Sequence, residues 1–199
     1  MRIALALGLA TSLLTLGACN QGDAGNATDT SQTGEARDAA GDKAIAAGLD
    51  QNSRFFQALK SSGLDKTLAG PDPYTVLAPG DDAFAKLPAG TTDNWGKPEG
   101  RAQLTGVLTN HILPGVVLAE DIGKAIDNAK GKAQLATMGG GTLTAAREGG
   151  KIVLTDASGN KATVTGQDEK FSNGVVHRID GVLMPAQGGA AQGSAAPAQ

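Results

Sequence analysis

Three side chains in this 199-residue chain could do chemistry near neutral pH: His111, His177 and Cys19, the two histidines and the single cysteine. An imidazole can act as a base or a metal ligand because it titrates near neutral pH. Two histidines without a cysteine or a closely spaced carboxylate make a poor zinc pattern. Each histidine lies in an apolar stretch, so we predict that both are buried, neutral and hydrogen bonded. We predict neither a metal nor a cofactor.

A serine-hydrolase triad can be drawn on paper from Ser172, His177 and Asp180. Such enzymes need the serine on a strained turn beside oxyanion donors, and the chain contains no Gly-x-Ser-x-Gly. The glycines at 139–141 are not followed by Lys-Ser/Thr or by a helical pattern, so they do not indicate a phosphate-binding loop. We interpret them as a bulge or a tight strand entry. We therefore predict no catalytic residue and no enzyme, and keep a hydrolase as an alternative.

The chemistry of Cys19 follows from what precedes it. Residues 3–16 form an apolar stretch after Met1-Arg2, too short to span a bilayer and typical of a secretory signal. Leu16-Gly17-Ala18-Cys19 resembles a bacterial lipobox, in which the peptidase cuts before the cysteine and the thiol is lipidated. We predict a lipoprotein signal peptide at 1–18 and lipidation of Cys19. An ordinary secretory signal with an incidental cysteine is the alternative.

The segments around the central part of the chain are poor in apolar side chains. The lipidated cysteine and a flexible tether are predicted at 19–41, where Ala is the largest apolar residue after the cysteine. The 22 residues from Asn20 to Gly41 would have a root-mean-square span of about 25 Å. A disordered tail of similar composition is predicted at 186–199. Residues 42–185 remain, which suits one domain.

Lipidation predicts a cell-envelope protein that is anchored in a membrane and faces the periplasm or the exterior. By the rule for bacterial lipoproteins, Asn20 after the cysteine favours the outer membrane. Loss of Arg2 with the leader takes the 17 basic residues to 16, against 20 acidic ones, a formal charge of −4. This mild acidity argues against nucleic-acid binding, which needs clustered Lys and Arg, so we predict no nucleic-acid partner.

The hydrophobic pattern predicts helices first and antiparallel hairpins afterwards, which indicates an α+β domain. Asn52 or Ser53 should cap a helix that ends at Gly63, and Asp81 or Asp82 should cap the turn that presents Phe84. The other predicted helices cover 64–68, 98–114 and 120–129. The predicted strands cover 75–77, 116–118, 133–138, 142–147, 151–155, 161–165 and 175–183.

Four segments stand out in order along the chain: Thr75 to Phe84, His111 to Gly115, Gly139 to Thr144, and Asn173 to Pro185. Together they resemble the signature segments of the fasciclin domain family. Leu77, Gly80 and Asn110 depart from the family's usual Phe, Thr and Tyr. The motif residues, which we interpret as mainly structural, are Thr75, Ala78, Pro79, Phe84, His111, Pro114, Gly115, Asn173, Gly174, His177, Ile179, Asp180 and Pro185.

The resemblance implies a fold and a class of function. The family fold is a β-wedge or sandwich of about seven strands flanked by several helices. The implied function is adhesion or interaction with a surface protein or polysaccharide. In animal members an Asp-Ile pair before the closing motif resembles an integrin-binding element, but Asp168-Glu169 stands here, so integrin binding is not implied. A small-ligand or lipid binder stays open as an alternative and would need a deep apolar pocket.

Overall fold

The computed structural model of the protein describes residues 41–186. The predicted signal peptide and Cys19 lie outside the described residues, as do the predicted tether up to residue 40 and the tail from residue 187. All described residues belong to one compact unit.

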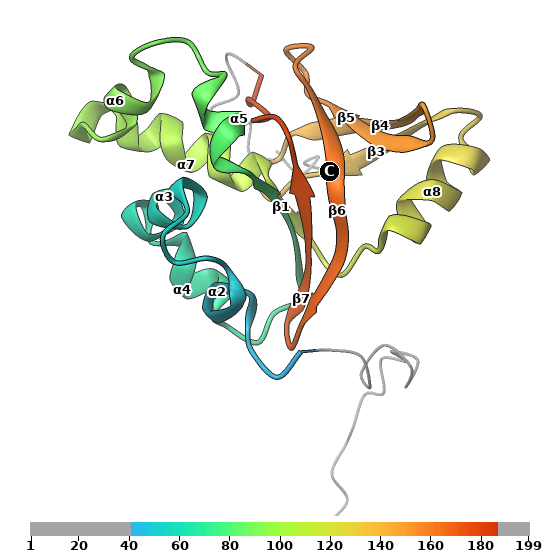
Figure 1. The fold of residues 1–199 in the computed structure, drawn as a ribbon, viewed down its shortest axis with the longest axis horizontal. Coiled ribbons are helices and arrows are strands. Elements are labelled where there is room, and N and C mark those ends of the chain that lie inside the picture. The colour runs from blue at the N-terminus through green and yellow to red at the C-terminus, as the bar shows by residue number, and fades with distance from the viewer. Residues whose placement is uncertain (1–40, 187–199) are drawn as a thin grey trace, which may run out of the picture. The chain divides into compact units, whose positions relative to one another are not determined.

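Short helices form most of the first half of the described chain (Figure 1). Their bounds are α2 (Ile45–Gly48), α3 (Arg54–Ser62), α4 (Leu64–Leu68), α5 (Asp81–Ala85), α6 (Thr91–Trp95), the 3-10 helix η1 (Pro98–Gly100), α7 (Arg101–Asn110) and α8 (Ala119–Asn128). Helix α3 has the predicted ends: the Ser53 side chain accepts the Phe56 N–H, and Gly63 at φ 79° closes the helix.

Seven strands form a single sheet, in the order β2-β1-β7-β6-β5-β4-β3. Their bounds are β1 (Tyr74–Pro79), β2 (Ile112–Pro114), β3 (Lys132–Ala136), β4 (Thr142–Glu148), β5 (Lys151–Thr155), β6 (Lys161–Phe171) and β7 (Gly174–Ile179). Only the β1–β7 pair among these is parallel. The sheet curls until its first and last strands approach, where the Met138 N–H donates to the Ile112 carbonyl at 2.7 Å. The α+β prediction with seven strands is confirmed.

The core has two parts, one on each face of β1 and β7. Helices α2 to α7 cover one face and pack on Val76, Ala78 and Val176, whereas α8 packs with the residues on the opposite face, among them Leu77 and Ile179 (Figure 1). Because both faces are covered, these two strands carry nearly continuous buried residues instead of an alternating pattern.

Two predicted elements around Pro114 are wrong. Residues 112–114 are strand β2 and not the end of a helix, since α7 stops at Asn110. The apolar spacing continues to His111. The His111 carbonyl, however, accepts the Leu77 N–H at 2.8 Å, so the chain begins to pair with β1 at this residue and the helix ends. Residues 116–118 form no strand, because Thr75 and His177 side chains bond the Val117 backbone in place of a strand partner.

The predicted cap at Asp81 or Asp82 is also wrong. Helix α5 has Gly80 at its N-cap position and no side-chain cap. The Asp81 Oδ1 atom instead accepts the Arg54 N–H at 3.0 Å, so it stabilises the start of α3, 27 residues away. Helices α2 and α6 were not predicted. Strand β6 extends beyond its predicted end to Phe171, and β7 ends at Ile179, short of its predicted end at Leu183.

The triple glycine forms the turn between β3 and β4. Gly140 has φ 77°, which favours glycine. A Cβ atom on Gly139 would lie 2.8 Å from Thr109 Oγ1, and one on Gly141 would lie 2.9 Å from Asn110 Oδ1. The turn therefore needs small residues because it packs closely on the end of α7.

Candidate functional site

Asn173, at the turn between β6 and β7, connects three parts of the domain. Its buried side chain accepts the Ile45 N–H at 2.8 Å and donates to the carbonyls of Leu68 and Gly70, also at 2.8 Å. The Ile45 N–H belongs to α2 and the Leu68 carbonyl to the end of α4, and Gly70 follows that helix. Gly174 follows at φ 147°, and a Cβ atom there would overlap the Tyr74 carbonyl oxygen. This half of the closing motif thus holds the helical layer against the sheet.

His177 lies fully buried in the middle of β7. Its Nδ1 atom accepts the Asp168 N–H at 3.3 Å, so Nε2 carries the proton and donates to the Val117 carbonyl at 2.9 Å. Asp168 has φ 55°, and its carboxylate accepts the Ala119 N–H at 2.9 Å, at the start of α8. The register of β6 on β7 shifts between Gly166 and Glu169. The imidazole therefore connects this shifted part of β6, strand β7 and the segment before α8, and each of its ring nitrogens has a hydrogen-bond partner.

Thr75 acts on the same segment from β1. Its hydroxyl donates to the Gly115 carbonyl and accepts the Val117 N–H, both at 2.8 Å. Gly115 has φ 85°, and its N–H donates to the Pro73 carbonyl at 2.9 Å. Residues 115–117 are consequently held by side chains of two motifs that lie about a hundred positions apart.

His111 is the C-cap residue that follows α7 and is also buried. Its Nδ1 atom donates to the Val107 carbonyl at 2.8 Å, and its Nε2 atom accepts the Leu183 N–H at 3.0 Å. The Phe55 ring lies 6.1 Å from the imidazole, centroid to centroid. Burial lowers the pKa of His111 from 6.5 to about 4, although the bond to Val107 and the Asp156 carboxylate oppose the shift. A neutral imidazole here serves as a structural hydrogen-bonding group.

Most of the remaining motif residues lie in or next to β1, β2 and β7. Pro114 is exposed at the end of β2, whereas Pro79 pairs in register with Ile179 at the opposite end of β1. Ala78 and Phe84 are buried, and the Phe84 ring meets Trp95 edge-on at 6.5 Å. The Asp180 carboxylate accepts the Thr163 N–H at 2.6 Å.

Ser172, His177 and Asp180 do not form a catalytic triad in the structure. The exposed Ser172 uses its N–H to bond the Lys43 carbonyl, Asp180 bonds Thr163, and both His177 ring nitrogens bond other groups. Within residues 41–186 there is no group of three or more His, Cys, Asp and Glu residues that could hold a metal ion. Across the same residues, Trp95 Nε1 is the single buried side-chain polar atom without a hydrogen-bond partner.

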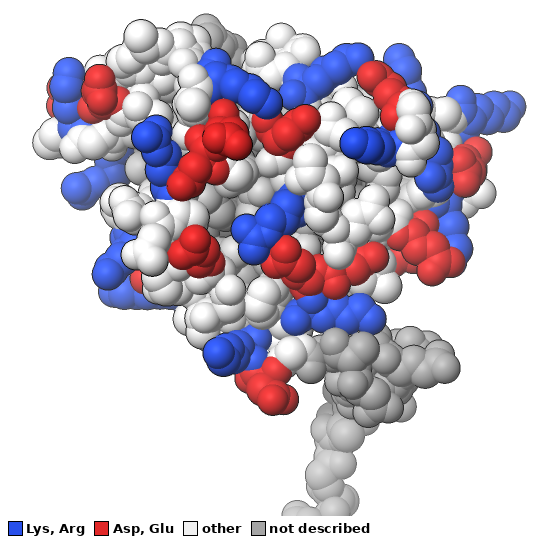
Figure 2. Space-filling view, viewed as in Figure 1, with Lys and Arg blue, Asp and Glu red and all other residues white. Residues whose placement is uncertain are grey.

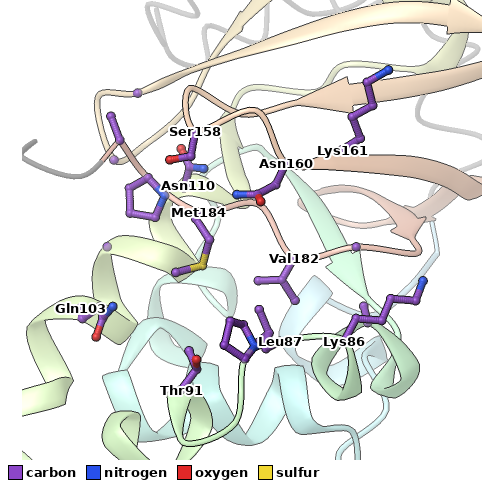
Figure 3. A pocket seen from close by; sticks show the side chains of 18 of the residues that line it. Lys86, Leu87, Thr91, Gln103, Asn110, Ser158, Asn160, Lys161, Val182 and Met184 are labelled. Atoms are coloured by element: carbon purple, nitrogen blue, oxygen red, sulfur yellow. The ribbon is translucent and has the colours of Figure 1, made fainter.

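A surface groove of about 1580 Å³ lies at the Pro79–Ile179 end of the two central strands and was not predicted. Figure 3 shows Met184, Val182 and Leu87 near its centre, with Gln103, Ser158 and Asn160 around them. Five segments form its walls: 83–91, 102–110, 139–141, 158–163 and 180–186. No local pattern could reveal a groove whose walls are so far apart in the sequence.

The buried Asp156 carboxylate shapes one wall of this groove. It accepts the Met184 N–H at 2.6 Å, together with the N–H groups of Ser158 and Asn160 at 2.8 and 2.9 Å. The groove's two lysines are engaged as well: Lys86 donates to the Asp180 carbonyl, and Lys161 to Glu148. Figure 2 shows basic and acidic side chains interspersed on the face in view.

The comparisons with known proteins identify the family. The profile described as the Fasciclin domain matches residues 50–185, more than half of the chain. The chain belongs to the fasciclin domain family. In this fasciclin domain three of the four motif segments form the hydrogen-bonded junctions described above, and the glycine segment packs closely on the end of α7. No helix within the described residues is both long and apolar enough to cross a membrane.

Relatives of this fasciclin domain occur in bacteria and animals. The chain is 37% identical over 141 residues to Protein sll1483 of Synechocystis, covering 71% of each chain. It is 35% identical over 129 residues to the transforming growth factor-beta-induced protein ig-h3 of Sus scrofa, covering 64% of this chain and 17% of that protein. A solved FAS1 domain pair from the insect cell adhesion molecule Fasciclin I matches with TM-score 0.51 and 25% identity, covering 65% of this chain and 44% of that one.

Proposed function

We propose that the protein is an extracytoplasmic adhesion or interaction protein, anchored in a bacterial envelope membrane through lipidated Cys19. Its partner is a surface protein or a polysaccharide. The family match over residues 50–185 carries this proposal, since a solved relative is part of a cell adhesion molecule. The hydrogen bonding of the two histidines agrees with a non-enzymatic role, because both ring nitrogens of each already bond the protein itself.

A small-ligand or lipid binder is the second candidate, and the groove is the observation that favours it. Small-molecule pockets usually enclose most of the ligand surface within apolar walls. Here the central Val182 and Met184 are surrounded by polar side chains such as Gln103 and Asn160, and the groove opens on the protein surface. This arrangement suits a macromolecular partner better than an enclosed lipid.

The anchor can be tested with Cys19→Ser in the full-length protein. Without the thiol no thioether can form, so we expect loss of lipid labelling, altered processing and loss of the protein from the membrane fraction. Labelling with a radioactive fatty acid and fractionation measure both. Asn20→Asp is the matched control and should keep the lipid while moving the protein toward the inner membrane. Normal processing and membrane retention of the serine variant would refute the anchor.

Adhesion can be tested in cells that lack the protein and are complemented with variants. We expect the deletion to reduce attachment to a neighbouring cell or matrix, and the wild-type gene to restore it. Gln103→Arg combined with Ser158→Arg places two bulky cations at the groove and should reduce attachment about thirtyfold, the effect of losing one interface hot spot of about 2 kcal/mol. Gln134→Arg, on the exposed side of β3, should leave attachment unchanged. Equal attachment with and without the gene would contradict an adhesive role.

A further inference from the structure

The two ends of the central strands carry different surfaces. At one end Pro114, Tyr74, Gly174 and Phe171 are register partners across β2, β1, β7 and β6. The groove lies beyond the other end, where β1 and β7 finish at Pro79 and Ile179. Tyr74 and Pro79, the first and last of the six residues of β1, lie about 17 Å apart at roughly 3.3 Å per step.

The polypeptide enters the domain at the first of these ends. The Gly41 N–H donates to the Lys170 carbonyl at 3.3 Å, and the Ser172 N–H donates to the Lys43 carbonyl at 3.0 Å. Figure 1 shows this entry beside the β6–β7 turn. We call this surface the tether end and define it by Lys43, Tyr74, Pro114, Val116 and Lys170. Any anchor upstream of residue 41 is therefore joined to the domain at the end opposite the groove.

The tether end has an apolar tip. Val116 is 44% exposed, and among residues 41–186 it is the one large hydrophobic residue that is exposed. Pro73 and Pro114 beside it are exposed, and Tyr74 is half-buried. A lone exposed valine is common in soluble proteins, so its exposure alone decides nothing. Here the loop is held by the bonds of Thr75 to Gly115 and Val117, so the tip cannot fold away from the surface.

The tether end carries charged side chains of both signs. Lys43 is exposed and Lys170 half-buried, and their long stems can keep the ammonium groups among lipid headgroups. Asp42 and Asp72 lie exposed at the same end, and Glu120 and Asp121 lie exposed four and five positions after Val116, so acidic side chains outnumber the two lysines. Attraction would then come from apolar contact at short range, supported by the two lysines, and not from a long-range field.

We propose that the tether end rests on the lipid surface, with the Val116 side chain among the headgroups and the groove facing outward. This inference relies on the lipid anchor of the proposed function. The sequence predicts a tether with a root-mean-square span of about 25 Å, which keeps the domain within reach of the membrane. At such a high effective concentration of the surface, a small apolar tip suffices to set the orientation. The groove is thereby displayed to partners outside the membrane.

The test uses the lipidated full-length protein reconstituted in vesicles of phosphatidylethanolamine and phosphatidylglycerol. Lipidation occupies the only native thiol, so Val116→Cys adds a single labelling site for an environment-sensitive fluorophore. Ser158→Cys, exposed at the groove, is the matched control. Both variants should keep the wild-type melting temperature. Headgroup-proximal brominated lipid should quench the label at 116 at least about twofold more than the label at 158, because interfacial side chains lie within roughly 5–10 Å of the acyl boundary.

Vesicle flotation separates the failure of this inference from that of the anchor. Protein that does not float with the vesicles would refute the anchor and, with it, the orientation. Protein that floats but shows equal quenching at both positions would overturn the orientation and leave the anchor standing. Preferential quenching at 116 that persists at about one protein per vesicle supports contact with lipid. An aqueous quencher gives a second measurement of how far the label at 116 is shielded from water. If that label is shielded only at high protein density, a second copy of the protein covers the tip and the proposal is wrong.

Discussion

Replacing Asn173 with Ala should lower the free energy of unfolding by about 3 to 5 kcal/mol, because each buried polar group left without a partner costs about 1 to 3 kcal/mol. The change removes one acceptor and two donor bonds, all at 2.8 Å. It leaves the Ile45 N–H and the Leu68 carbonyl without this partner in a region closed to water, since both residues are 0% exposed. Urea unfolding of the wild type and the variant measures the difference.

Two further substitutions make this prediction specific. Asn173→Asp keeps an acceptor for the Ile45 N–H but points an oxygen at two carbonyls, so it should be at least as destabilising as Ala. Asn52→Ala removes an exposed side chain of the same type and should change stability by less than about 0.5 kcal/mol. A loss below about 1 kcal/mol for Asn173→Ala would mean that water replaces the amide and that the junction contributes little.

Features with local causes could be predicted from the sequence. Helix α3 has a serine cap, an apolar face and a terminal glycine within eleven positions, and its predicted ends are those observed. In hairpins β4–β5 and β5–β6, turn-forming residues such as Gly149-Gly150 join the two strands. Helix α8 likewise has Ile122 and Ile126 on one face. In each case the determining contacts lie within a few residues, so the pattern contains them.

Features with distant causes could not be predicted. The helical spacing through His111 is correct as a pattern, but β1 pairs with the next three residues and ends the helix. Asp81 caps a helix other than the one beside it. The imidazole of His111 accepts a bond from Leu183, 72 positions away. Such contacts depend on how the sheet brings the motifs together, which no local pattern specifies.

The candidate site shows the same division. The motif residues were identifiable from the sequence, and so was the burial of both histidines. Their bonding partners were not, because Thr75 and His177 act on backbone groups of residues 115–117 that have no polar side chain to signal the contact. The groove arises from five segments, and the tether end from strand register. Both surfaces are therefore products of topology and not of any motif.

Acidification should destabilise the protein between pH 6.5 and about pH 4, chiefly through His111. Its pKa is lowered from 6.5 to about 4 in the folded state, with burial as the main cause. In this window the unfolded chain binds a proton that the folded protein excludes, so the free energy of unfolding falls as the pH falls. The full effect is about 3 kcal/mol, and below about pH 4 this group adds no further loss. Urea unfolding at half-unit steps of pH measures the slope.

The physical reason is that protonation would force a donor onto Nε2, where the Leu183 N–H already donates, and would place a charge among apolar side chains. His111→Gln removes the titration, so its stability, although lower at pH 7, should vary much less between pH 7 and 5, where carboxylates titrate little. His177→Gln is the matched control for the second buried histidine and should retain the His111 slope. An unchanged pH slope in His111→Gln would show that another group senses acid, and that the buried imidazole at the end of α7 stabilises the fold without coupling it to pH.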